Sequence, residues 1–550
     1  MKLKLNGCEM DFAPGARWLD LLDVLPEGEK GLAPLGVCLQ GRTLSLNEEA
    51  ISGADARVLT YADEEGRRIY ERSLQFLFLA ALRREAPQAR ARIEHSFGQG
   101  LYIDISGVSA SPALARRVEA QMRALVSEDL PFARSDCTKD EAVEYFTRTG
   151  QQDKVQLLKY RSFGNFRFYE MDGMLEYFYG EMVPSTGCLK VFALSYYMPG
   201  FVLRMPDTQA PGQAAPLKDM PKLMRTFAES ARWNDILGCT NAADLNEMIA
   251  GKRFREFVRI NEALQERTIQ RIADQFISSG ARLICIAGPS SSGKTTFANR
   301  LQIALRVLGK RPVKLSLDDY YLDRDMIPVG EDGQRDFERI DTLDIELLGE
   351  QLVRLLQGDA VDVPEFDFVE GRRSERTHRM QVPAGEPIVI EGIHALNDQL
   401  TASVPREMKF KIYISALTML NLDDHNRIRT TDARLLRRIV RDHQFRGTPP
   451  EETMAMWASV RRGEEAYIFP WQEEADAMFN SSLMYELPVM KKYVYPVLCA
   501  VPETSPHYTL ARRLVKFLNY IRTADVEDEI PPNSLLREFI GGSCFYKTEG

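Results

Sequence analysis

The chain has 550 residues, more than one hydrophobic core usually supports, so two to four domains are expected. Its formal net charge of -9 argues against a nucleic-acid backbone as the main partner, and its eight cysteines show no zinc-ligand spacing. We therefore expect free thiols in a reducing cytoplasm. The apolar run 76–82 is too short to cross a membrane, so no membrane partner is expected either.

Two small regions are predicted before a linker. Residues 1–62 alternate apolar and polar positions around a short helical stretch at 19–25, which predicts a small mixed α/β module. Residues 63–205 begin with a helical pattern from Arg68 and continue into short strands, among them 101–105 and 166–170. The stretch 206–221, rich in Pro, Ala and Gln, then predicts a linker and a domain boundary.

The second half has the pattern of an α/β domain. Residues 206–280 are expected to hold the linker and connecting helices, with a long amphipathic helix at 254–277. In residues 281–550, predicted strands at 283–287, 313–317, 388–390 and 410–414 alternate with predicted helices at 297–308, 343–356 and 433–444. This alternation predicts a parallel sheet with helices on both faces. The aromatic and acidic stretch 463–486 is expected to be packing.

A glycine-rich segment gives the sharpest local signal. The sequence GPSSSGKT at 288–295 has the G-x4-G-K-[ST] pattern, placed between a predicted strand and a predicted helix. The glycines let successive N–H groups point at phosphate oxygens, while a lysine reaches the outer phosphates and a threonine hydroxyl reaches Mg²⁺. We expect ATP and Mg²⁺ to bind here, with ATP against GTP left open, through Gly288, Pro289, Ser290, Ser291, Ser292, Gly293, Lys294, Thr295 and Thr296.

Acidic side chains follow two further strands. Asp318 and Asp319 come directly after the strand 313–317, and Glu391 follows the strand 388–390. Ligands of parallel α/β sheets bind at the carboxyl ends of the strands, so these acids are expected to face the phosphate loop. One carboxylate can accept the proton of an attacking hydroxyl while others hold the metal.

Arginines crowd the predicted helix near 433–444, at 434, 437, 438, 441 and 446. Charge at this density often marks a solvated face. The alternative, which we favour, is a lid that closes over the triphosphate, excludes water and stabilises the charge that develops during transfer.

These motifs, GPSSSGKTT, SLDDYY, PEFDF, IEGIH and D-x-R-L-x-R-R-x-x-R-D, resemble the uridine kinase and phosphoribulokinase branch of P-loop kinases. The resemblance implies that Asp318 deprotonates a sugar hydroxyl of a small-molecule acceptor, and that Thr295, Asp318 and Glu391 surround magnesium. It assigns catalysis also to Lys294, Arg434, Arg438 and Arg441, and ATP contacts to Arg437 and Arg446. Acceptor contacts are expected from Asp319, Tyr320, Glu338, Phe366, Arg372 and His394, although a structural role fits His394 equally well.

The sequence departs from uridine kinases where the acceptor is read. Their FDHP appears here as FERI at 337–340, and their YDF with a base-contacting histidine appears as FDF at 366–368 followed by Gly371. Phosphorylation chemistry is therefore better supported than uridine as the acceptor. A nucleoside is the leading hypothesis, and a sugar phosphate or another polyol is the alternative. Whether the chain forms homo-oligomers stays open.

The first 200 residues resemble threonyl-tRNA synthetase: a ubiquitin-like TGS module over 1–62 and an editing-type domain over 63–205. Similar stretches are HSFGQGLYIDI, KVQLLKY and VPSTGCLKVFAL. The family's HxxxH positions are Arg72 and Phe76 here, and its Cys and His before VPxTG are Phe178 and Met182, so no editing is expected, although the domain could bind a ligand. The combination resembles bacterial nucleoside kinases with an N-terminal TGS domain. A third hypothesis is an RNA- or ribosome-associated sensor with the P-loop as a switch.

Overall fold

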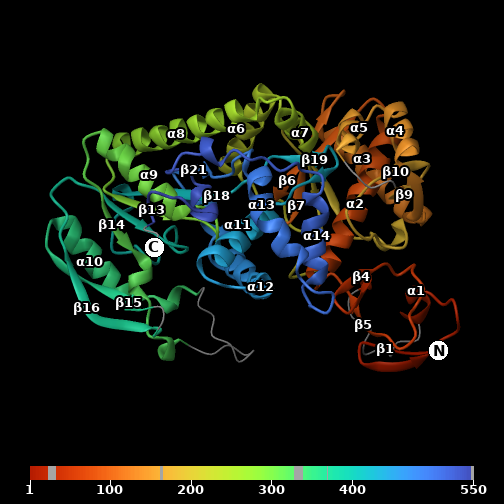
Figure 1. Cartoon of the computed structure of the whole chain (residues 1–550), viewed down its shortest axis with the longest axis horizontal. Coiled ribbons are helices and arrows are strands. Elements are labelled where there is room, and N and C mark those ends of the chain that lie inside the picture. Colours follow the sequence, from red (N-terminus) through yellow and green to blue (C-terminus); the bar gives the residue numbers. More distant parts are fainter. Residues whose placement is uncertain (23–32, 161–164, 328–338, 368–369, 547–550) are drawn as a thin grey trace.

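The computed structural model describes residues 1–22, 33–160, 165–327, 339–367 and 370–546. The molecule is elongated, with the N-terminal module at one end and a parallel sheet near the other (Figure 1). No helix among the described residues is both long and apolar enough to span a membrane. All eight cysteines are free.

The N-terminal module is a mixed sheet in the order β2-β1-β5-β3-β4, in which β1 and β5 run parallel. Trp18 is fully buried in its core, on the short helix α1. The predicted helix at 19–25 is tested only to Leu22, because residues 23–32 lie outside the described part. The elements are β1 Lys2–Leu5, β2 Cys8–Asp11, α1 Trp18–Leu22, β3 Gly36–Leu39, β4 Arg42–Leu44 and β5 Asp55–Leu59.

The second region packs two helices and two antiparallel sheets around one core. The sheets have the orders β11-β12-β7-β6 and β10-β9-β8, and the predicted strands at 101–105 and 166–170 fall within β7 and β9. Helix α2 carries buried apolar side chains along most of its length and packs against α3. The elements are α2 Glu64–Glu85, β6 Arg90–Phe97, β7 Gly100–Ser106, α3 Pro112–Glu128, β8 Ala133–Thr138, α4 Lys139–Arg148, α5 Gln152–Lys159, β9 Asn165–Met171, β10 Met174–Glu176, β11 Ala193–Tyr197 and β12 Gly200–Arg204.

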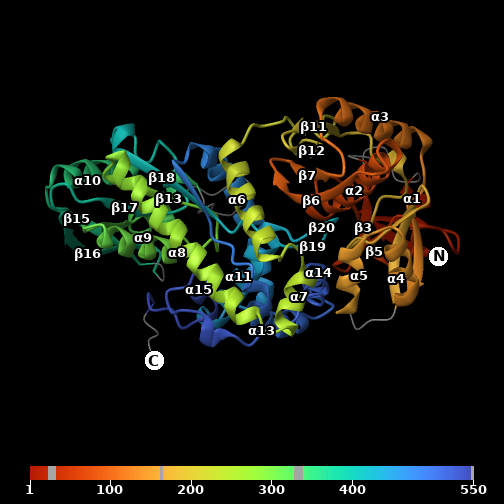
Figure 2. The same ribbon diagram turned by 90° about the horizontal axis from the view of Figure 1, so that it is seen from above.

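The stretch predicted as a linker contacts its neighbours at a few points and is exposed over much of its length. The Tyr61 hydroxyl donates a hydrogen bond to the Pro206 carbonyl oxygen at 2.9 Å, and Ala215 is buried. Three helices follow, α6 Pro221–Leu237, α7 Ala242–Ala250 and α8 Phe254–Ser279, the last of which matches the predicted amphipathic helix. Seen from above, α8 runs along the molecule beside the parallel sheet (Figure 2).

A five-stranded parallel sheet in the order β14-β17-β13-β18-β21 forms the centre of the second half. Its central strand β13 is buried on both faces: Ile284 and Ile286 pack in one core, which includes α8 and α9, while Leu283 and Cys285 pack in another, which includes α10. The predicted fold class, α/β with helices on both faces of a parallel sheet, is confirmed. All four predicted strands are present, and the fifth, β21, was missed inside the stretch 463–486.

The elements of this half are β13 Leu283–Ala287, α9 Lys294–Val307, β14 Val313–Ser316, α10 Ile345–Gln357, β15 Val361–Asp367, β16 Arg372–Met380, β17 Ile388–Glu391, β18 Lys409–Ser415, β19 Asn421–Asp423, β20 Asn426–Arg427, α11 Thr430–Phe445, α12 Pro450–Tyr467, β21 Ala477–Asn480, α13 Glu486–Cys499, α14 Tyr508–Leu518 and α15 Arg537–Ile540.

Candidate active site

The phosphate loop connects the central strand β13 to helix α9. A side chain at Gly288 would place its Cβ 2.0 Å from the Ile414 carbonyl oxygen of β18, so only glycine allows this close approach. Gly293 has a φ of 84° at the start of α9, in the left-handed region that glycine adopts at little cost. The glycines therefore shape a loop whose amides meet a helix N-terminus, the arrangement that suits phosphate.

The loop encloses a cavity of about 210 Å³ lined by residues 290–295. The buried hydroxyls of Ser291 and Ser292 have no hydrogen-bond partner among the described residues, which leaves polar groups for a ligand. Lys294 donates from Nζ to the carbonyl oxygens of Gly288 at 2.9 Å and Pro289 at 3.2 Å. Burial lowers the pKa of Lys294, and a phosphate anion placed beside it would favour the charged ammonium form again.

A carboxylate bridges the loop and the neighbouring strand. Glu391, the last residue of β17, accepts hydrogen bonds from the Thr295 hydroxyl at 2.8 Å and from Lys314 Nζ at 3.2 Å. Strand register causes this meeting, because Glu391 pairs with Ile286 of β13 on one side and with Ser316 of β14 on the other.

Asp318 lies one short turn beyond β14, in a single turn of 3-10 helix. Its pKa is raised above the usual aspartate value by burial and then by the nearby Glu391 carboxylate, while Lys294 acts in the opposite direction. The structure thus brings together Lys294, Thr295, Asp318 and Glu391, as the sequence predicted. A carboxylate with a raised pKa is better suited to accept a proton near neutral pH.

The adjoining Asp319 faces the hairpin of β15 and β16. Burial raises its pKa, and a hydrogen bond from the Phe366 backbone N–H works against that rise. Phe366 in turn packs against Tyr321, with ring centroids 5.8 Å apart. These residues form one wall beside Asp318, where an acceptor molecule would have to lie.

Two predicted acceptor contacts, Tyr320 and His394, are corrected by the structure, whereas Arg372 stays a prediction. Tyr320 is fully buried and donates to Gln351 Oε1 at 2.6 Å, so it holds the 3-10 turn on α10. Arg372 is exposed on the hairpin and pairs with Glu370. His394 is 1% exposed and contacts the Tyr467 ring, so it lies beneath the surface. The remaining contact, Glu338, lies outside the described residues.

Two of the five lid arginines are structural. Arg434 donates to the Ser290 carbonyl oxygen at 2.9 Å and forms an ion pair with Glu464. Arg437 donates to the Ser481 carbonyl oxygen at 2.8 Å and forms an ion pair with Glu486. Both guanidinium groups are buried and occupied, so they brace the phosphate loop from behind, which corrects the prediction that they close over the triphosphate.

The other three arginines gather around Asp442. Arg441 lines the loop cavity and pairs with Asp442 at 2.9 Å, whereas Arg438 also donates to the Ser290 hydroxyl at 3.0 Å. Arg446 is mostly exposed and lies 3.4 Å from Asp442. Arg438 and Arg441 are therefore the arginines that can reach phosphate oxygens.

Sequence reasoning missed two acids and a tyrosine that touch the loop. Glu464 of α12 accepts the Ser290 backbone N–H at 3.0 Å, and Glu538 of α15 accepts the Thr296 hydroxyl at 2.6 Å. The Tyr546 phenol lies against the same helix start: loss of solvent raises its pKa, and its contacts with Thr296 and Thr295 work against that rise. These groups come from distant segments that carry no motif, so no local signal could identify them.

A glycine-rich loop follows the central strand β13 of a parallel sheet, and carboxylates stand at the ends of β17 and β14, which lie on one side of β13. This arrangement defines a P-loop phosphotransferase domain. Comparison with known families agrees, since residues 283–485 match the model described as "Phosphoribulokinase / Uridine kinase family". The chain is 30% identical over 206 residues to a uridine kinase of Deinococcus deserti, covering 37% of this chain and 89% of that protein. The chain belongs to the phosphoribulokinase and uridine kinase family.

The chain is also similar to a solved structure and, over its first third, to a tRNA ligase. A solved structure described as a possible uridine kinase from Bacillus stearothermophilus is 20% identical and covers 39% of this chain and 97% of that one, with a TM-score of 0.27. The threonine–tRNA ligase of Carboxydothermus hydrogenoformans is 32% identical over 167 residues, which are 30% of this chain. The chain spans only 26% of the length of that ligase.

Proposed function

We propose that the protein transfers the γ-phosphoryl group of ATP to a ribose hydroxyl of a nucleoside. The observation that carries this proposal is the meeting of Lys294, Thr295, Asp318 and Glu391 at one edge of the sheet. Phosphoryl transfer requires mainly positioning and charge stabilisation, so a phosphate-binding loop beside a basic carboxylate is a sufficient core for it.

Each group has a separate task in this proposal. The amides and the unpartnered serine hydroxyls of the loop hold the phosphates, and Lys294 neutralises charge on the outer ones. Asp318 accepts the proton of the attacking hydroxyl, a role that contributes about 10²- to 10⁴-fold in rate. Arg438 and Arg441 add positive charge at the cavity edge.

The donor set also fits magnesium. No three His, Cys, Asp or Glu side chains gather to hold a metal within the part of the chain that the structure describes. Mg²⁺ commonly takes only one or two carboxylates and completes its shell with phosphate oxygens and water, and Thr295, Glu391 and Asp318 suit that pattern. When bound, the ion would neutralise charge on the phosphates.

A coupled assay of ATP consumption against a panel of nucleosides, sugars and sugar phosphates tests the proposal. We expect turnover with at least one nucleoside, and we expect Lys294→Ala to remove it while Lys516→Ala, an exposed lysine on α14, leaves it unchanged. ATP binding without turnover of any nucleoside would disprove the assignment. Turnover of only a sugar phosphate or polyol would instead establish the second candidate, which the departures at 337–340 and 371 from uridine kinases favour.

A further inference from the structure

A second polar cavity lies between the N-terminal half and the kinase half. It measures about 80 Å³, which is room for several water molecules or one small oxyanion. Its walls come from α2, from the segment after β10, from the chain around β19 and β20, from the first turn of α11 and from α14. Five arginines line it, together with the carboxylates of Glu71 and Asp432: Arg68, Arg72, Arg427, Arg429 and Arg513. We call this cavity the arginine cleft.

The positive charges in the arginine cleft exceed the negative ones. Asp432 pairs with Arg513 and Arg68, and Glu71 pairs with Arg429 at 2.7 Å and Arg427 at 3.3 Å. Glu64 and Glu65 at the edge approach Arg68 as well. Four carboxylates thus pair with four of the arginines, and the fifth, Arg72, has no carboxylate within ion-pair distance among the described residues.

Arg72 is held in place without being neutralised. Its Nε donates to the Glu181 carbonyl oxygen at 3.0 Å, and its guanidinium packs against Gly180, where a Cβ would lie 2.7 Å from it. Burial lowers the pKa of Arg72 to about 10 and that of Arg429 to about 9. The buried Nε of Arg427, whose side chain is only 7% exposed, has no hydrogen-bond partner in the described part of the chain. Buried donors without acceptors are costly unless a ligand supplies the acceptor.

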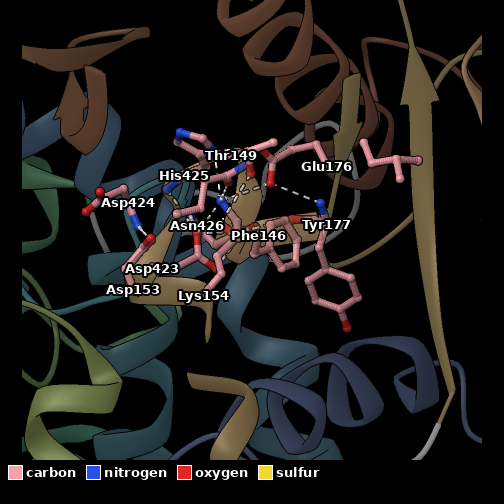
Figure 3. A network of polar contacts seen from close by, with 12 residues as sticks. Phe146, Thr149, Asp153, Lys154, Glu176, Tyr177, Asp423, Asp424, His425 and Asn426 are labelled. Atoms are coloured by element: carbon pink, nitrogen blue, oxygen red, sulfur yellow. Dashed lines mark hydrogen bonds and ion pairs between the residues drawn. The ribbon is translucent and has the colours of Figure 1, made fainter. Parts of the chain in front are cut away.

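A buried network of ion pairs next to the arginine cleft has an opposite charge beside each of its charged groups. Lys154 contacts Glu176 at 2.9 Å and Asp423 at 3.6 Å, and His425 contacts Glu176 at 2.7 Å (Figure 3). Each buried charge there faces an opposite one. The arginine cleft lies directly beside this network, since His425 borders both, yet it lacks the balancing acceptor.

We propose that the arginine cleft is a binding site for a phosphate-class oxyanion, either inorganic phosphate or the phosphate group of a small metabolite. Guanidinium groups match phosphate oxygens through paired N–H donors, and Arg72, Arg427 and Arg429 bring such donors to one cavity. The volume admits a phosphate group but excludes a long polyanion. Phe178, Leu422 and Phe517 supply apolar parts of the lining.

The site is physically connected to the phosphate loop. Asp432, which Arg68 and Arg513 hold, lies in the first turn of α11, and Arg434 of the same turn donates to the Ser290 carbonyl oxygen. An anion in the cleft would share Arg68 and Arg513 with Asp432. Helix α11 therefore carries both the wall of the cleft and the brace of the loop.

Calorimetric titration with inorganic phosphate on the full chain tests the proposal. Because the phosphate loop also binds phosphate, Lys294→Met serves to remove that site. We expect two sites in the wild type, one in Lys294→Met, one in Arg72→Gln, and none when both changes are combined. If the wild type shows a single site that is lost in Arg72→Gln and kept in Lys294→Met, phosphate binds in the arginine cleft. That result would contradict only the expected binding of free phosphate to the phosphate loop.

Melting temperatures with and without phosphate distinguish a phosphate-binding arginine from one with only a structural role. Without phosphate, Arg72→Gln is expected to keep or raise the melting temperature, because it removes an unpaired buried charge, and to lose the phosphate-induced rise. Arg429→Gln should lose that rise too, whereas Arg117→Gln, at an exposed arginine, should keep it. Failure of Lys294→Met to bind phosphate, or binding that survives Arg72→Gln combined with Lys294→Met, would overturn the proposal.

Discussion

The Thr295 hydroxyl donates a hydrogen bond to the Glu391 carboxylate across 2.8 Å, which joins the helix after the phosphate loop to the end of the adjacent strand. This contact fixes the spacing between the groups that would hold the phosphates and the carboxylates that would act on the acceptor. Burial, and then the Glu391 carboxylate, raise the pKa of Asp318, the third member of the site.

Replacing Asp318 by Asn should lower kcat by about 10²- to 10⁴-fold, because the hydroxyl loses its proton acceptor. Affinity for ATP measured without Mg²⁺ should not fall, since the change removes a negative charge beside the phosphates. The folded pKa of Asp318 is raised, so wild-type kcat/KM should decline with acid at a pH above the usual aspartate value of 3.8. Steady-state kinetics across pH measure both effects, with Asp359→Asn, an exposed aspartate, as the control. Near-normal kcat in Asp318→Asn would assign the base elsewhere.

Replacing Glu538 by Gln should tighten ATP binding. Its carboxylate lies on the Thr296 hydroxyl at the edge of the loop cavity, where it repels phosphate charge. Two like unit charges about 4 Å apart in water repel each other by roughly 1 kcal/mol, so removing one of them is expected to raise ATP affinity about fivefold. Fluorescence titration with a labelled ATP analogue measures the change, and Glu407→Gln at an exposed position is the control. Weaker binding in Glu538→Gln would mean that the carboxylate supports the loop.

Arg437 and Glu486 form a buried pair, so removal of one partner should be costly. Arg437→Met is expected to destabilise the protein by about 3–5 kcal/mol, because it leaves the Glu486 carboxylate uncompensated, and the double variant Arg437→Met/Glu486→Met should recover most of that loss. Thermal unfolding of both variants checks this, with Arg446→Met, an exposed position, as the control. An unchanged melting temperature together with a large fall in kcat would restore the lid assignment for Arg437.

Glu176 should contribute stability that acid removes. Although burial favours its neutral form, Lys154 and His425 lower the pKa of Glu176 to about 2, below the ordinary value of 4.5. Its stabilising effect is therefore fully present above about pH 4.5 and is lost as the pH falls toward 2. Glu176→Gln should lower the melting temperature at pH 7, with a difference from wild type that shrinks on acidification. Other carboxylates, Asp153, Asp423 and Asp424, lie nearby, so the comparison is made between the two proteins at each pH.

A difference that stays constant from pH 7 down to pH 3 would contradict the role given to the Glu176 charge. Glu144→Gln, on the neighbouring helix α4, is the matched control and should change the melting temperature little at any of these pH values. Circular dichroism provides the unfolding curves.

The central sheet and the core of the site were predictable because their signals are local. The phosphate loop follows a fully apolar strand, and Asp318 and Glu391 stand directly after strands, so parallel topology alone brings them together. Strand β21 was not predictable, since AMFN is short and is embedded in charged and aromatic residues. Its place at the sheet edge depends on pairing with β18, a contact made across a long sequence separation.

The arginine segment shows where charge patterns mislead. Arg434 and Arg437 lie on the inner face of α11, and their fate depends on Glu464 and Glu486, which distant helices bring to them. The sequence shows the positive charges but cannot show which face meets a buried acid. For the same reason Tyr320 was assigned to the acceptor, although Gln351 holds it in the core.

The backbone of the N-terminal half is hydrogen-bonded directly into the kinase half. The amide of Ile93 on β6 donates to the Asp424 carbonyl oxygen at 2.8 Å, and Asn421 donates to the Ile93 carbonyl oxygen at 2.9 Å. Cutting the chain before α6 would leave the Asp424 carbonyl oxygen and the Asn421 side chain without these partners on the catalytic fragment, and Asp432 would lose Arg68. We therefore expect the catalytic half to be less stable when it is expressed without the N-terminal half, because polar groups on its surface lose their hydrogen-bond partners.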